Sequence, residues 1–173
     1  DRKAIPMLIK VLEDVNQEPM VRHEAGEALG AIGSSDVIQV LEKHLKDPIT
    51  EVAETCELAL ARIKWMQNPD NTKKKLSDNP YCSVDPAPPA SIADVDNLRS
   101  ILLDENKSLF ERYRAMFSLR NLRTQDAVIA LGSALKCGSA LFRHEIAFVL
   151  GQLQDECSVP FLKESLEDQS ENE

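Results

Sequence analysis

Two Arg-His-Glu tripeptides place an imidazole beside a carboxylate in a chain that has only three histidines. One tripeptide contains His23 and Glu24, and the other contains His144 and Glu145. Imidazole and carboxylate groups are good ligands for iron, manganese or zinc. Adjacent residues on a helix diverge by ~100°, so one pair supplies one or two ligands and a complete site needs groups from further helices. These four residues are therefore the candidate metal ligands.

Internal repeats organise the chain around these tripeptides. Repeats with periods of 20–50 residues are typical of solenoid proteins. At an offset of 31 residues, Val21–Ile32 aligns with Val52–Ile63, and Glu111–Leu122 aligns with Phe142–Leu153. At an offset of 154 residues, Asp1–Asp14 aligns with Asp155–Asp168. The two periods indicate a tandem duplication of an array of repeats.

Each repeat has the pattern of two helices. The expected helices are Ala4–Leu12, Pro19–Ile32, Asp36–Leu45, Thr50–Trp65, Ile92–Asp104, Leu109–Asn121, Thr124–Lys136, Ala140–Leu153 and Ser158–Leu166. The prolines and polar residues of 68–91 exclude a long helix there. We therefore expect an all-α fold of HEAT-like helical hairpins, an α-solenoid. It has one short array at 1–67, a proline-rich linker at 68–91 and a second short array at 92–173.

Helical phasing separates the histidines from the apolar stripes. Relative to both His23 and His144, apolar residues stand at positions −2, +2, +5, +6 and +9, on the opposite face. In a solenoid, the face away from the repeat's own core lines the concave groove. Gly30 and Gly151 stand seven residues after the histidines, and we expect them to leave open volume near each imidazole. The third histidine, His44, is near a helix end and is interpreted as structural.

Composition narrows the classes of function. The net charge of −9 and pI near 4.9 argue against nucleic-acid binding and favour a cationic ligand or a basic partner. No run approaches the ~18 apolar residues that span a bilayer. The four cysteines show no metal or disulfide spacing, which favours a reduced intracellular location, the cytoplasm.

Four segments carry a family resemblance that covers essentially the whole chain: Pro19–Gly33, Asn79–Pro89, Leu109–Asn121 and Gly138–Gln154. They resemble the deoxyhypusine hydroxylase family. The resemblance implies a HEAT-repeat, non-haem di-iron monooxygenase. Such an enzyme uses dioxygen to hydroxylate the deoxyhypusine side chain of a translation initiation factor, and the product is hypusine.

The resemblance also implies site residues. The family carries four His-Glu pairs that hold two Fe²⁺ ions, and this sequence has two of them. The offset of 154 places the counterpart of His23 beyond residue 173 and that of His144 before residue 1, so we expect the central part of such an enzyme. Metal roles transfer to His23, Glu24, His144 and Glu145, with Glu24 or Glu145 holding the substrate amine instead. For these residues alone, we expect weak or absent iron binding and no hydroxylase activity. The oligomeric state stays open, and a dimer would supply four pairs.

Two other functions fit the same repeats. A non-enzymatic HEAT scaffold would bind a protein through its groove without a metal. A HEAT-type lyase that attaches bilin pigments would need an apolar groove, which nothing in the sequence specifies. Iron analysis separates the metal enzyme from both.

Overall fold

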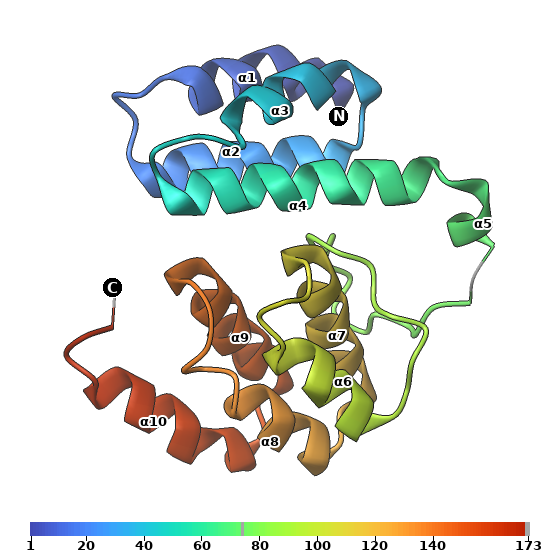
Figure 1. Cartoon of the computed structure of the whole chain (residues 1–173), viewed down its shortest axis with the longest axis vertical. Helices are drawn as coiled ribbons and strands as arrows, with labels where there is room; N and C mark the ends of the chain where they lie inside the picture. Colours follow the sequence, from blue (N-terminus) through green and yellow to red (C-terminus); the bar gives the residue numbers. More distant parts are fainter. Residues whose placement is uncertain (74, 172–173) are drawn as a thin grey trace. The chain divides into compact units, whose positions relative to one another are not determined.

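The computed structural model describes residues 1–73 and 75–171, and this part of the chain contains helices and no β-strand (Figure 1). The chain divides into two compact units. Unit 1 comprises 1–73 together with Val84–Ala87, and unit 2 comprises Lys75–Ser83 together with 88–171. The all-α class expected from the sequence is confirmed.

Unit 1 consists of two helical hairpins. Its helices are α1 (Ile5–Glu13), α2 (Pro19–Ile32), α3 (Ile38–His44), α4 (Thr50–Gln67) and the short α5 (Pro69–Thr72). Helices α1 and α3 form one layer, and α2 and α4 lie side by side in a second layer (Figure 1). The inner pair α2–α4 therefore belongs to two successive repeats.

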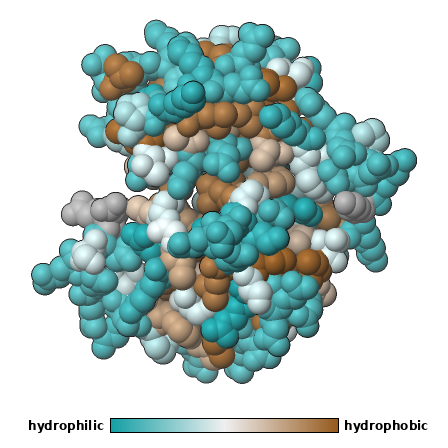
Figure 2. All heavy atoms as spheres, in the orientation of Figure 1, coloured by the Kyte–Doolittle hydropathy of each residue, from teal (hydrophilic) through white to brown (hydrophobic). Residues whose placement is uncertain are grey.

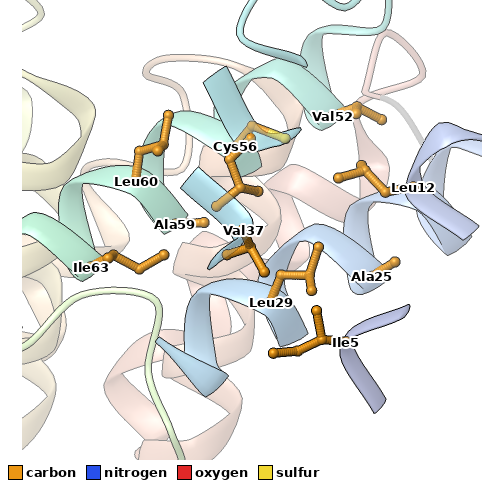
Figure 3. Close-up of a cluster of buried hydrophobic side chains, with 11 residues drawn as sticks. Ile5, Leu12, Ala25, Leu29, Val37, Val52, Cys56, Ala59, Leu60 and Ile63 are labelled. Carbon is orange, nitrogen blue, oxygen red and sulfur yellow. The ribbon is translucent and has the colours of Figure 1, made fainter. Parts of the chain in front are cut away.

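The core of unit 1 fills the space between these two layers. Leu12, Leu29 and Ile63 are fully buried, and Cys56 and Ala59 of α4 line the same cluster (Figure 3). Val21 departs from the phasing, because it was expected on the buried stripe of α2 and is exposed. Since α2 contacts both α1 and α4, its buried surface is wider than one stripe and is rotated away from Val21.

Unit 2 repeats the hairpin pattern. Its helices are α6 (Val95–Leu103), α7 (Leu109–Leu122), α8 (Gln125–Gly132), α9 (Ala140–Leu153) and α10 (Val159–Glu167). Side chains at the N-caps accept hydrogen bonds from the first turns of four of these helices: Asp94, Ser108, Thr124 and Ser139. Such caps satisfy N–H groups that have no partner within the helix, and they fix where it begins.

The helix bounds agree best where the capping signals are clear. Helices α2 and α9 have the bounds expected from the sequence. Helix α6 begins three residues later than expected, because Asp94 caps it. Helix α8 ends at Gly132 instead of Lys136. There the N–H groups of Ala134, Leu135 and Cys137 bond three residues back, which tightens the backbone into turns.

The proline-rich segment contributes backbone to both units. Within unit 1, Arg62 Nε donates to the carbonyl of Asp85 at 3.2 Å, and Ala87 is fully buried. Within unit 2, Arg114 Nε donates to the carbonyl of Pro88 at 3.1 Å. The linker boundaries at 68 and 91 stay a prediction, since both units take pieces of this segment.

The surface in the view of Figure 2 is predominantly hydrophilic, with scattered hydrophobic residues. Exposed large apolar side chains include Met7, Val15, Phe148 and Leu166. Among the described residues, no helix is long and apolar enough to cross a membrane.

Candidate metal centre

The two Arg-His-Glu tripeptides occupy equivalent places on inner helices. His23 is the fifth residue of α2, and His144 is the fifth residue of α9. Proline begins α2 at its first turn, and the hydroxyl of Ser139 caps α9 by accepting from the Phe142 N–H at 3.2 Å. Helix α2 lies in unit 1 and α9 lies in unit 2.

The arginine of each tripeptide anchors its helix. Arg22 Nε donates to the Leu12 carbonyl at 2.9 Å, and its Nη1 and Nη2 donate to both carboxylate oxygens of Asp47 at 3.1 and 2.5 Å. Burial alone would raise the pKa of Asp47, but hydrogen bonds from Arg22 and from the Ile49 N–H outweigh that effect. The pKa of Asp47 therefore lies below its ordinary value. Arg143 makes the corresponding anchor on α9, donating to Glu171 at 2.9 Å.

His23 is buried, with 5% of its surface exposed. Its Nδ1 lies 2.5 Å from the hydroxyl oxygen of Thr55 on α4. The same hydroxyl donates to the carbonyl of Glu51 at 2.7 Å. That His23 leaves the apolar core of its own repeat stays a prediction, and the side chain that its Nδ1 contacts is a threonine of the next inner helix. The imidazole is not open to solvent, because its flank of α2 packs against the next inner helix. That this face lines a concave groove stays a prediction.

A second carboxylate, which the sequence reasoning missed, lies one helical turn after His23. Glu27 Oε2 is 3.7 Å from His23 Nε2. Burial raises the pKa of Glu27, and the nearby charges of Glu24 and Asp85 raise it further. The spacing of four residues was the available signal, since such residues share one helix face.

The two glycines differ in their surroundings. A Cβ atom on Gly30 would lie 2.7 Å from the Cβ of Ala59, so the expected open volume beside His23 does not exist there. Gly30 instead permits close contact between α2 and α4. A Cβ atom on Gly151 would have no neighbour within 4 Å, as the open-volume interpretation requires.

The remaining candidates show an inverse pattern of exposure. Glu24 is exposed beside the buried His23, whereas His144 is exposed beside Glu145, of which 8% is exposed. His44 ends α3, is buried, and its Nδ1 lies 2.9 Å from the Val40 carbonyl, as a structural histidine would. Across 1–73 and 75–171, no three His, Cys, Asp or Glu side chains are grouped closely enough to hold a metal ion.

The donor types nonetheless suit iron within each unit. His23 offers an imidazole with a carboxylate nearby, and His144 and Glu145 offer a second imidazole and carboxylate. Nitrogen and oxygen donors of this kind are those of non-haem iron sites. Each tripeptide therefore offers donor atoms of a suitable type without completing a metal site among the described residues.

Comparison with known proteins decides the family of the repeats. A family model described as "HEAT repeats" matches residues 1–61. A second, described as "PBS lyase HEAT-like repeat", matches 111–137 and 142–168. Both descriptions name repeats of the HEAT type. The expected HEAT-like fold class is thus confirmed in both units.

Several relatives of the chain carry the same name. Deoxyhypusine hydroxylase of Danio rerio is 60% identical over 99% of the chain and 57% of its own length. That of Drosophila melanogaster is 59% identical over 100% of the chain and 57% of its own length. A solved structure of human deoxyhypusine hydroxylase in complex with glycerol matches with a TM-score of 0.91 and 56% identity, over 99% of this chain and 59% of that one. The resemblance indicated by the sequence is confirmed, and the chain spans 57% of the length of these first two relatives.

Proposed function

We propose that these residues are part of a deoxyhypusine hydroxylase, a non-haem di-iron monooxygenase of the cytoplasm. The substrate is the deoxyhypusine side chain of a translation initiation factor, and the product is hypusine. The observation that carries the proposal is the identity of 59–60% to enzymes of that name along the whole chain. This favours the enzyme over a scaffold that binds a protein without chemistry.

The proposed metal ligands are His23, Glu24, His144 and Glu145. Two bound Fe²⁺ ions in the complete enzyme would supply the dioxygen chemistry that no side chain provides. The burial of His23 and its bond to Thr55 support a ligand role, because metal-binding histidines are usually held by a hydrogen bond through the other ring nitrogen.

The glutamates are also proposed to hold the cationic amine of the substrate. Glu24 is exposed and has the access that a substrate contact requires, and Glu145 is the second candidate. The net charge of −9 supports recognition of a cationic side chain, since an acidic surface attracts cations.

The proposed activity requires regions of the relatives that this chain does not span. Residues 1–173 contain two His-Glu pairs, whereas the complete site is expected to need four. We therefore propose weak or absent iron binding and no turnover for this chain alone. A dimer that brings two copies of each pair together is the alternative route to a complete site. Two tightly bound irons in a monomer of this chain would refute the incomplete-site proposal.

The decisive experiment measures iron in a full-length protein that contains these residues. Metal analysis should find two irons per protein, and His23→Ala or His144→Ala should remove iron and hydroxylation of a deoxyhypusine-containing factor together. His44→Asn is the matched control, because the asparagine amide can take the place of Nδ1–H and donate to the Val40 carbonyl, and it should retain both. A wild-type protein without iron would reject the hydroxylase and favour the scaffold.

A further inference from the structure

The contact between His23 and Thr55 joins two successive repeats. The two residues stand 32 positions apart, on α2 and α4, and their Nδ1 and Oγ1 atoms are 2.5 Å apart. We propose that Thr55 is a positioning residue that fixes the tautomer and the ring orientation of His23, so that Nε2 is the nitrogen presented to a metal ion. The binding of a metal ion by Nε2, which we call the metal clause, rests on the proposed function. The assignment of the His23 tautomer, which we call the tautomer clause, does not.

The protons of this contact can be assigned by counting donors. The Thr55 hydroxyl has one proton, and the Glu51 carbonyl can only accept. Because the hydroxyl donates to Glu51 at 2.7 Å, the Thr55 oxygen must accept from His23. His23 Nδ1 therefore carries a proton, and in the neutral ring Nε2 carries the lone pair. A neutral imidazole with that lone pair is the form that binds metals.

Thr55 is held rigidly enough to serve this role. Its side chain is buried, with 3% of the residue exposed. Its hydroxyl is fixed by the Glu51 carbonyl, and its methyl group faces Gly26, where a Cβ atom would lie 3.0 Å from Cγ2. A β-branched side chain with both branches in contact has one available rotamer, so Oγ1 is directed at His23.

A hydroxyl also suits the charges around the ring. Glu27 Oε2 already lies 3.7 Å from Nε2. At the position aligned with Glu24 one repeat later, α4 carries Thr55 instead of a further carboxylate. Thr55 thus orients the imidazole without adding another negative charge beside the ring.

The first test reads the tautomer in the metal-free chain by ¹⁵N NMR of the histidine rings, near pH 8, where an ordinary imidazole is neutral. Wild-type His23 should show a protonated Nδ1 and an unprotonated Nε2. Thr55→Val keeps the shape and removes the oxygen, so the two ring signals should move toward the average of both tautomers. Thr55→Ser should restore the wild-type pattern.

His44 is the internal control, because its Nδ1 contacts the Val40 carbonyl instead of Thr55. Its ring signals should be the same in all three proteins, which reports that the fold of unit 1 is intact. Unchanged His23 signals in Thr55→Val, beside unchanged His44 signals, would overturn the assignment.

The second test measures Fe²⁺ affinity in a full-length protein that contains these residues. Loss of such an indirect contact typically lowers metal affinity ~10–100-fold, and we expect Thr55→Val to fall in that range and Thr55→Ser to recover. If wild type binds no iron while the tautomer depends on Thr55, the proposed function fails and the positioning role stands. If iron affinity is the same in Thr55→Val and wild type, the metal clause fails.

Discussion

Gly30 on α2 and Ala59 on α4 lie so close that a Cβ atom at Gly30 would be 2.7 Å from the Cβ and 2.9 Å from the Cα of Ala59. Gly151 occupies the same position relative to its histidine, yet nothing lies within 4 Å of its Cβ direction. The two glycines therefore allow one prediction, in which Gly151 is the matched control for Gly30.

Gly30→Ala should destabilise the protein by about 1–3 kcal/mol, because the added methyl group overpacks two helices whose backbones must separate. Gly151→Ala should instead be neutral or stabilise by up to ~1 kcal/mol through helix propensity. Urea denaturation of both variants measures the free energies of unfolding. Equal effects of the two substitutions would contradict the close contact between α2 and α4.

The Arg22–Asp47 pair predicts a pH dependence. Both side chains are buried, with 4% and 6% exposed, and Asp47→Asn should cost about 3 kcal/mol at neutral pH by leaving the arginine charge uncompensated. Since the pKa of Asp47 is lowered on folding, the stability it contributes is complete above the unfolded pKa of ~3.9. It is lost as pH falls through the folded pKa.

Denaturation midpoints at several pH values measure this window. The gap between wild type and Asp47→Asn should be constant above about pH 5 and should narrow below about pH 4. A stability difference that stays the same down to the lowest pH would show that the charge of the Asp47 carboxylate does not stabilise the pair.

At Arg112, unit 2 has no counterpart of the Arg22–Asp47 ion pair, because a cysteine, Cys137, stands where the aspartate would be. Arg112 repeats Arg22 ninety residues later, and its Nε donates to the Leu102 carbonyl at 2.9 Å. At the same offset Cys137 replaces Asp47. In the described part of the chain, Arg112 Nη2 is buried without a hydrogen-bond partner, although the guanidinium stacks 4.0 Å above the Phe142 ring.

Cys137→Asp should therefore stabilise the protein by about 1–2 kcal/mol, the range of a hydrogen bond to a charged group. Cys137→Ser, which adds no carboxylate, is the control. Thermal unfolding should show the aspartate variant melting ~2–4 °C above the control for each kcal/mol gained. Identical melting of both variants would mean that the carboxylate does not reach Arg112.

The cysteines should differ sharply in reactivity. Burial raises the pKa of the Cys56 thiol to about 12, with a further rise from Asp47, while Cys82 is exposed. Because the thiolate is the reactive form, iodoacetamide near pH 8 should modify Cys82 in the folded protein and reach Cys56 only in denaturant. Peptide mass spectrometry reads both sites, and early labelling of Cys56 would be incompatible with its buried place on α4, facing α2.

Much of the fold could be predicted because its signals are local. Prolines, capping residues and apolar periodicity placed α2 and α9 at their observed bounds. The end of α8 was missed, because its last turns continue a helical pattern while the backbone tightens after Gly132.

The candidate site was only partly predictable, because its contacts join residues about one repeat apart. Phasing within α2 puts His23 opposite the apolar stripe, but it cannot tell that α4 covers that flank. Gly30 was expected to leave open volume, whereas it lies where α2 contacts α4. Thr55 became visible only when the register between α2 and α4 placed its hydroxyl against the imidazole.

Unit 1 is discontinuous, because Val84–Ala87 returns to it after Lys75–Ser83 has joined unit 2. A break before Val84 would take the Asp85 carbonyl away from Arg62. A break after Ala87 would separate Tyr81 from unit 2. The Tyr81 ring lies 5.0 Å from the guanidinium of Arg120 in that unit. No single recombination point in this segment exchanges one array intact, so the two arrays are expected to be inherited together.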